Sequence, residues 1–187
     1  MSFLLFANSD PVVLPARRNA LLLSGAAIAL LAGREALAEG AAAKPEDLQI
    51  LNTALGAEHE AVAAYQVGAE SGLLQKPVLD LAVKFQGHHK QHIDVLAKTI
   101  EKLGGKAAGP KAKYEFPVAQ LKTQADVLGF AAKLEQGAVS AYLGAVPLFA
   151  NRDLAKAAAS ILGDEAMHWA VLRQALGQDP VPSAFVS

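Results

Sequence analysis

The sequence predicts an all-α protein, a four-helix bundle in which two helical hairpins are joined by a long crossover. Hydrophobic residues make up 52% of the 187 positions, and alanine, which loses no side-chain entropy in a helix, is abundant. Apolar residues recur every three or four positions rather than alternating, which excludes a sheet as the main element. Of the three connectors between the predicted helices, the middle one, residues 105–122, is by far the longest. This pattern of short, long and short links is typical of bundles with one crossover.

The first predicted hairpin has recognisable ends. Its first helix begins at Pro45, a residue that suits a first helical turn, and Glu46 and Asp47 complement the helix dipole there. Its second helix begins near Pro77 and ends at the glycine pair 104–105. Both boundaries therefore follow from local signals alone.

The second predicted hairpin is bounded in the same way. Residues 123–126, Thr-Gln-Ala-Asp, form a plausible capping box for the third helix, and Pro147 is expected to kink or end that helix. Asn151 or Asp153 can cap the fourth helix, which ends at Gly177.

The two hairpins are related to each other in sequence. Residues 58–65, which begin with Glu58 and end with Tyr65, align with residues 135–142, and residues 92–96 align with residues 168–172. The separation from glutamate to histidine is 34 residues in the first copy and 33 in the second. Two like hairpins can place matching side chains around a pseudo-twofold axis.

Ionisable residues interrupt the apolar stripe of every helix near its middle. Residues three apart lie on one helix face, so the two side chains of each pair, 89/92 and 165/168, can act together as a pincer. Burying several unpaired charges costs several kcal/mol each at least, and a divalent cation can compensate for it. Carboxylate and imidazole are good ligands for Fe, Mn and Zn. The predicted metal ligands are Glu58, His89, His92, Glu135, Glu165 and His168.

This pattern resembles the ferritin-like di-metal carboxylate superfamily, especially its small exported members, over roughly residues 45–177. Two helices of that family each supply a lone glutamate, and the other two each supply Glu-x-x-His. Glu58 and Glu135 match the lone glutamates, and Glu165-x-x-His168 matches one of the pairs. The resemblance implies a ferritin-like fold and a two-metal site.

The resemblance also assigns roles to two tyrosines and exposes one departure. Tyr65 and Tyr142 each follow a lone glutamate by seven residues, and in the family such tyrosines hydrogen-bond the ligating carboxylates. His89 stands where the family has a bridging glutamate. Three carboxylates facing two divalent ions leave a charge of −3 + 4 = +1. A bridging hydroxide, Glu60, or the binding of a single metal would resolve this imbalance, while His59 and His88 are expected at the surface or rim.

Residues 1–38 are predicted to be an export signal that precedes the bundle domain, residues 39–187. Arg17 and Arg18 come before an apolar run that ends at Gly33, and a small-x-small site follows at residues 36–38. The arginine pair resembles a twin-arginine signal, which implies a periplasmic protein. An uncleaved segment that anchors the chain in the membrane is the alternative.

These features lead to two expectations for function. The first is an exported metal-binding protein with a dinuclear site, with iron the first choice and Mn or Zn the alternatives. Such a site implies ferroxidase or peroxidase chemistry with O2 or peroxide as partner. The second is a non-enzymatic stress-protective or structural bundle whose metal site is mononuclear, weak or absent. With 17 basic and 18 acidic residues and no basic stripe, nucleic acid is not an expected partner, whereas a homodimer is compatible with the sequence.

Overall fold

The computed structural model describes residues 44–186, and this part of the chain contains helices and no strand. The long helices are α2 (Pro45–Glu70), α3 (Lys76–Lys102), α4 (Gln124–Ala145) and α5 (Arg152–Ala175), and the short 3-10 helices are η2 (Val118–Gln120) and η3 (Val146–Leu148). The predicted all-α bundle is confirmed. None of the described helices is both long and apolar enough to cross a membrane. The predicted export signal, residues 1–38, lies outside the described residues.

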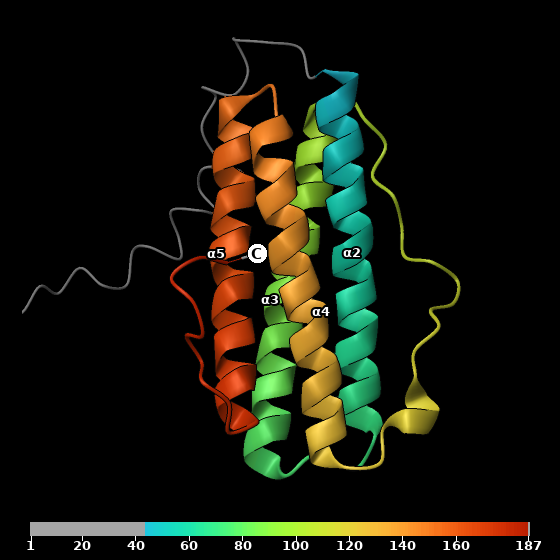
Figure 1. Cartoon of the computed structure of the whole chain (residues 1–187). Coiled ribbons are helices and arrows are strands. Elements are labelled where there is room, and N and C mark those ends of the chain that lie inside the picture. Colours follow the sequence, from blue (N-terminus) through green and yellow to red (C-terminus); the bar gives the residue numbers. More distant parts are fainter. Residues whose placement is uncertain (1–43, 187) are drawn as a thin grey trace, which may run out of the picture.

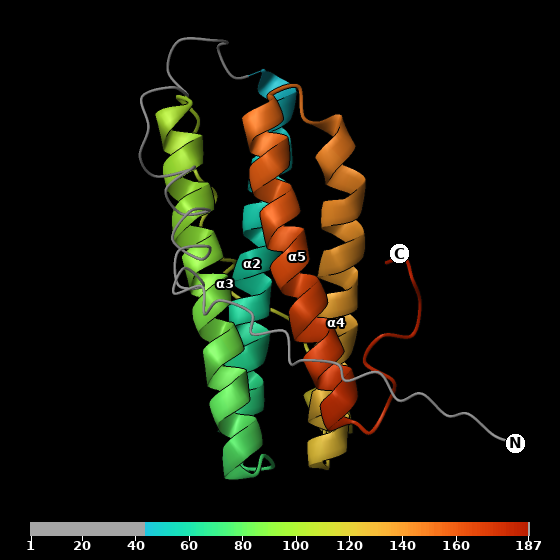
Figure 2. The same ribbon diagram turned by 90° about the vertical axis from the view of Figure 1, so that its left-hand side faces the viewer.

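The helices pair as two hairpins, α2 with α3 and α4 with α5 (Figure 1). The connector between α3 and α4 runs along the outside of α2 from one end of the bundle to the other (Figure 1). Because of this crossover, α3 and α4 run in the same direction. Seen from the side, α5 lies in front, with α3 and α4 on either side of it (Figure 2).

The ends of α4 and α5 depend on the residues that the sequence singled out. Thr123 accepts a hydrogen bond from the backbone N–H of Asp126 at 3.2 Å, and the Asp126 carboxylate accepts one from the Thr123 N–H at 2.8 Å. Asn151 caps α5 by accepting from the Asp153 N–H at 2.8 Å. Gly177 follows α5 with a φ of 71°, a conformation that glycine adopts without a steric penalty. Local chemistry therefore ends these helices where the sequence predicted.

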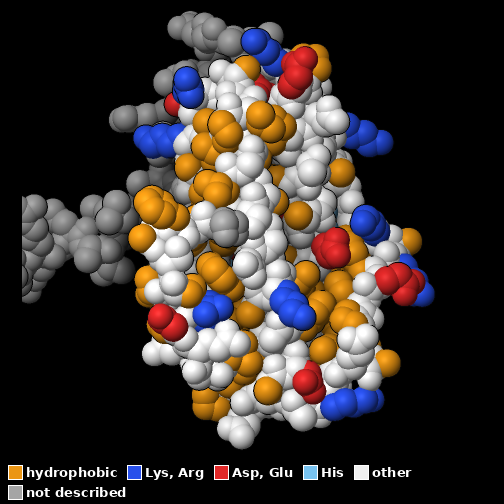
Figure 3. Space-filling model, viewed as in Figure 1, with side chains coloured by type: hydrophobic (Ala, Val, Ile, Leu, Met, Phe, Trp, Pro, Cys, Tyr) orange, Lys and Arg blue, Asp and Glu red, His pale blue; other side chains and the backbone are white. Residues whose placement is uncertain are grey.

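The apolar core consists of two separate clusters along the bundle. One is centred on Leu55, Ile100 and Ile161, and the other on Phe85 and Leu172. Buried ionisable side chains lie along the same helices between these clusters. On the face shown in Figure 3, charged side chains of both signs are scattered among apolar ones. The polar interior is therefore enclosed by apolar packing at both ends.

A buried aspartate ties the two hairpins together at one end of the bundle. Asp47, in the first turn of α2, is 1% exposed. Its carboxylate oxygens accept hydrogen bonds from the backbone N–H groups of Ala150, at 2.8 Å, and Asn151, at 3.2 Å. These two residues form the turn between α4 and α5, so Asp47 fixes the start of α2 against the second hairpin.

We expect Asp47→Ala to lower the free energy of unfolding by about 1.5–3 kcal/mol, the usual worth of hydrogen bonds to a charged group. Asp80→Ala is the matched control, because the Asp80 carboxylate pairs with Lys76 at the surface, where the two side chains are 62% and 82% exposed. That change should stay within about 0.5 kcal/mol. Urea denaturation of both variants checks the difference, and equal losses would contradict the role of Asp47.

Candidate metal centre

The structure brings all six predicted ligands together in the middle of the bundle. Five of them are at most 3% exposed, and the side chain of the sixth, His92, is 14% exposed. Their ligand atoms form two overlapping groups, each with atoms within 4.8 Å of one another. One group contains Glu58, His89, His92 and Glu165, and the other contains His89, Glu135, Glu165 and His168.

The two groups are related by the sequence repeat and share His89 and Glu165. His92 Nδ1 lies 3.4 Å from Glu58 Oε2, and His168 Nδ1 lies 3.4 Å from Glu135 Oε1. The two Glu165 oxygens face opposite ways, with Oε1 3.2 Å from His92 Nδ1 and Oε2 3.6 Å from His168 Nδ1. A carboxylate in this position can bridge two cations, one on each side.

The donor atoms of this centre fit divalent metal ions. Both Glu165 oxygens and His168 Nδ1 are buried and make no hydrogen bond. Burial raises the pKa of Glu165, and the neighbouring Glu135 carboxylate raises it further, against the opposing effect of His168 and His92. Leaving such groups unpaired is costly. Divalent cations bound on the two sides of Glu165 would use all three atoms.

His89 is the exception to this pattern, because its ring lies between two carboxylates. Its Nδ1 lies 2.8 Å from Glu58 Oε2, and its Nε2 lies 3.3 Å from Glu135 Oε1. Burial alone would lower the pKa of His89, but hydrogen bonds to Glu135 and Glu58 outweigh it and raise the pKa to about 10. A protonated His89 therefore donates to both glutamates and acts as an internal cation.

The other two predicted histidine ligands, His92 and His168, are held in the same charge state. Burial lowers the pKa of His92 and of His168, but the surrounding carboxylates outweigh it and raise these values to about 12 and about 9. Burial raises the pKa of Glu58, but His89 and His92 outweigh it and lower the pKa to about 2. Without metal the centre is thus a network of carboxylate–imidazolium pairs. Each histidine that becomes a ligand must first release a proton.

The two tyrosines cross between the hairpins to reach the lone glutamates. The Tyr142 hydroxyl, on α4, donates to Glu58 Oε1 on α2 at 2.6 Å. The Tyr65 hydroxyl, on α2, donates to Glu135 Oε1 on α4. Burial and the adjacent carboxylate raise the pKa of both tyrosines, so their hydroxyl groups keep the proton that they donate. Each hydrogen bond orients one glutamate toward the centre.

We expect Tyr142→Phe to weaken metal binding about 10–100-fold on the Glu58 side of the centre, as losses of groups behind a ligand do. In the metal-free protein the same change should cost about 1.5–3 kcal/mol. Calorimetric titration and urea denaturation measure the two effects. Tyr114→Phe is the control, because the Tyr114 hydroxyl accepts an exposed backbone N–H from Lys111 in the crossover. Loss of affinity in both variants would contradict the assignment.

Comparison with known proteins agrees with this geometry. The profile of the ferritin-like domain family matches residues 46–178. The chain belongs to the ferritin-like domain family. A search of curated proteins gave no match.

Solved structures support the ferritin-like fold. A conserved hypothetical protein from Mycobacterium tuberculosis is 24% identical, with a TM-score of 0.65 over 75% of this chain and 96% of that one. A structure from Bacillus anthracis, described as ferritin-like diiron-carboxylate proteins, is 20% identical, with a TM-score of 0.61 over 70% and 95%. A dodecameric thioferritin from Bacteroides fragilis is 22% identical, with a TM-score of 0.60 over 70% and 84%. At these identities the similarity establishes the fold alone.

One acidic residue of this ferritin-like centre, Asp164, was not predicted from the sequence. Its Oδ2 lies 3.3 Å from His168 Nε2 and 3.4 Å from His92 Nε2, so one carboxylate faces the outer nitrogens of both histidines. Burial raises the pKa of Asp164, but a hydrogen bond from His92 and the nearby histidine charges outweigh it and lower the pKa. Asp164 thus supplies a fourth carboxylate, which would balance the charge of two divalent ions. Glu60 had been one of the candidates for this role in the sequence. The signal was available, because Asp164 precedes His168 by four residues and shares its helix face.

His88 was assigned to the rim, and the structure adds contacts that the sequence did not predict. Its side chain is 30% exposed, and its Nδ1 lies 2.8 Å from His168 Nε2 and 3.2 Å from Asp164 Oδ2. Burial lowers the pKa of His88, although the Asp164 charge partly opposes this shift. His59, in contrast, lies at the surface with Nε2 3.3 Å from the Ala108 carbonyl oxygen. His88 precedes His92 by four residues, as Asp164 precedes His168, so the two occupy equivalent positions in the sequence repeat. This equivalence was the sequence signal that both lie near the centre.

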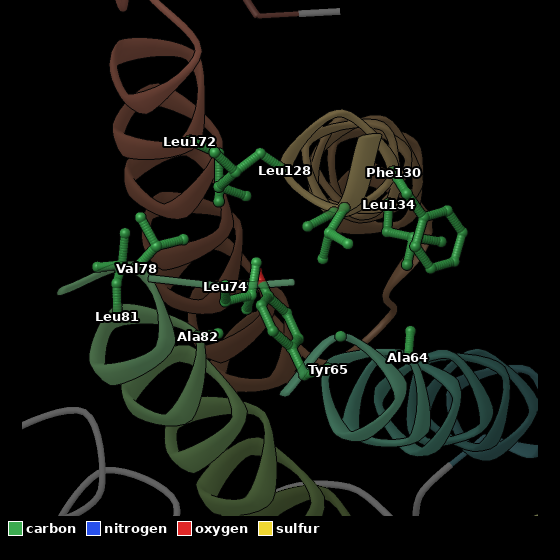
Figure 4. A pocket seen from close by; sticks show the side chains of 13 residues that line it. Ala64, Tyr65, Leu74, Val78, Leu81, Ala82, Leu128, Phe130, Leu134 and Leu172 are labelled. Atoms are coloured by element: carbon green, nitrogen blue, oxygen red, sulfur yellow. The ribbon is translucent and has the colours of Figure 1, made fainter. Parts of the chain in front are cut away.

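An apolar cavity lies beside the centre, among all four long helices of the ferritin-like bundle (Figure 4). Leu81 on α3, Leu128 on α4 and Leu172 on α5 point into it (Figure 4). It contains none of the candidate metal ligands. Tyr65 also lines it and connects it to the centre, because its hydroxyl donates to Glu135.

Proposed function

We propose that this ferritin-like protein is exported, binds two divalent metal ions, iron first among them, and oxidises Fe(II) with O2 or peroxide. The observation that carries the proposal is the position of Glu165, whose two buried oxygens make no hydrogen bond and face His92 on one side and His168 on the other. The similarity to the structure described as diiron-carboxylate supports iron. Mn and Zn accept the same donor set and remain the alternatives.

The candidate ligands of such a centre fall into two halves, one for each ion. Glu58 and His92 would hold one ion, Glu135 and His168 the other, and Glu165 both. Iron held by these residues would supply electrons to dioxygen or peroxide. The surrounding apolar clusters exclude water from the centre, which strengthens the electrostatic interactions inside it.

One further residue, Asp164, orients two of the ligands. Asp164 Oδ2 lies 3.4 Å from Nε2 of His92 and 3.3 Å from Nε2 of His168, and the Nδ1 atom of each ring is directed at the centre. Such a partner also makes an imidazole a more basic ligand. The contacts therefore set the tautomer that metal binding requires.

The activity is tested by Fe(II) oxidation under air, followed by absorbance of Fe(III) and by oxygen consumption. We expect the wild-type chain to bind iron and oxidise it faster than buffer does. His168→Ala should lose bound iron and the rate enhancement, while His59→Ala should keep both. Wild-type protein that neither retains iron nor accelerates oxidation would contradict the proposal.

Export is tested separately, because it depends on residues 1–38. Expression of the full chain should yield periplasmic protein whose mass corresponds to a mature chain that begins at Glu39. Lys substitutions of Arg17 and Arg18 should retain the protein inside the cell if the twin-arginine route is used. Full-length protein in the membrane fraction would instead support the uncleaved anchor.

A metal-free structural bundle is the second candidate function, and the position of His89 favours it. Its ring nitrogens bridge Glu58 and Glu135, so a proton on His89 supplies part of the charge that a metal would otherwise provide. This reading predicts purified protein without metal and a melting temperature that does not change with iron. Iron-dependent stabilisation would exclude it.

A further inference from the structure

We propose that His88, Asp164 and the outer nitrogen of His168 form a third divalent-cation site, through which metal ions enter the buried centre. The inference rests on the proposed function, because it requires the inner centre to take up metal. It concerns the rim residues His88 and Asp164, which lie outside the two inner groups. The inner groups alone provide no partly exposed carboxylate at which an ion could first bind.

The three atoms have the spacing of a coordination triangle. His88 Nδ1 and His168 Nε2 are 2.8 Å apart, His88 Nδ1 and Asp164 Oδ2 are 3.2 Å apart, and His168 Nε2 and Asp164 Oδ2 are 3.3 Å apart. Ligands bound to one ion at about 2.0–2.2 Å lie roughly 2.8–3.1 Å apart in octahedral geometry and roughly 3.3–3.6 Å apart in tetrahedral geometry. Two imidazoles and one carboxylate form a donor set that suits Fe(II), Mn(II), Co(II) and Zn(II).

Exposure decreases from this rim group to the centre. The side chains of His88 and Asp164 are 30% and 23% exposed, whereas those of His168 and Glu165 are 2% and 0% exposed. The rim group joins α3 to α5, which lie next to each other on the face seen in Figure 2. An ion that arrives from solvent can therefore reach His88 and Asp164 before it reaches any fully buried ligand.

His168 connects the rim group to the centre through its two ring nitrogens. Its Nε2 faces His88 and Asp164, and its Nδ1 faces Glu135 at 3.4 Å. A neutral imidazole offers one lone pair at a time, because the other nitrogen carries the proton. The rim and the inner group thus compete for His168. An ion at the rim uses the Nε2 lone pair while the proton is on Nδ1, 3.4 Å from Glu135 Oε1. Its transfer inward requires Nδ1 to release that proton toward Glu135 and Nε2 to regain one on the side of Asp164, whose Oδ2 is 3.3 Å away.

The kinetics of Co(II) uptake test the entry site, since bound Co(II) absorbs visible light and can be followed by stopped-flow. We expect His88→Ala to slow uptake about tenfold or more, with the final number of inner ions unchanged. His88→Glu, which restores a ligand, should recover the wild-type rate. His59→Ala, which removes a surface histidine distant from the rim group, should not change it.

Two outcomes separate the inference from the function on which it rests. Uptake by His88→Ala at the wild-type rate, in protein whose Co(II) binding still requires Glu165, overturns the entry site and leaves the centre intact. Equal Co(II) binding by wild-type protein and Glu165→Gln overturns the centre itself, and the entry site with it. Circular dichroism melting of each variant establishes that the comparison is made on folded protein.

Discussion

Replacing Glu165 with glutamine is expected to abolish metal binding in both halves of the centre. Glu165 is the carboxylate that both ligand groups share, and each of its oxygens faces a different histidine. The affinity loss should exceed about 100-fold, because even groups behind a ligand contribute about 10–100-fold. Metal content after loading with Fe(II) or Mn(II), and calorimetric titration, measure the stoichiometry and the affinity.

Glu58→Gln is the informative comparison for this variant. Glu58 belongs to one group alone, so its loss should leave the ion held by Glu135 and His168. The expected stoichiometries are therefore two ions for the wild type, one for Glu58→Gln and none for Glu165→Gln. Metal-free Glu165→Gln should fold about as well as the wild type, because burial and the neighbouring Glu135 raise the pKa of Glu165 and so favour its neutral form, which glutamine matches in shape. Two ions bound to Glu165→Gln would contradict the bridging role.

Replacing His89 with leucine is expected to have the largest effect on the stability of the metal-free protein. The protonated His89 ring pairs with Glu58 and Glu135, all three being at most 3% exposed. Removing one partner from a buried ion pair costs about 3–5 kcal/mol, because the remaining charge has no compensation. Urea denaturation in the presence of a chelator measures the loss. His59→Leu is the control at a partly exposed histidine.

The pH dependence identifies the cause of that loss. The pKa of His89 rises from 6.5 to about 10 on folding, so its contribution is complete below pH 6.5 and is lost as the pH rises through about 10. The wild-type protein should therefore be more stable than His89→Leu by the full amount near pH 6, and the gap should narrow toward pH 10. The stabilising contributions of His92 and His168 also fall at alkaline pH, but they do so in both proteins. The difference in unfolding free energy between the wild type and His89→Leu therefore isolates His89. A gap that stays constant with pH would indicate a packing defect instead.

The elements of the fold were predictable because their signals are local. The Thr123 capping box, the proline after α4 and the glycine after α5 act within a few residues, so they operate in the same way in any tertiary context. The crossover followed from connector length, since a long link allows two hairpins to pack with α3 and α4 parallel. These predictions needed no knowledge of which helices are neighbours.

The six side chains of the centre were also visible in the sequence, because charged residues at buried positions of an apolar stripe are costly and require a partner. Their helical phase was sufficient to predict that they face inward. The sequence repeat then related Glu58 to Glu135 and His92 to His168, as the matching 3.4 Å contacts show.

Tertiary structure alone decided how these groups pair. The sequence could not match Tyr65 with Glu135, or Tyr142 with Glu58, because each hydrogen bond crosses from one hairpin to the other. The bonded residues are 70 and 84 positions apart in the chain. The contacts of Asp164 and His88 depend on the packing of α3 against α5, which determines what lies behind each histidine. Helical periodicity specifies the direction of a side chain relative to its own axis. The partner it meets is set by the rotation and separation of neighbouring helices, and these follow from the packing of the whole core.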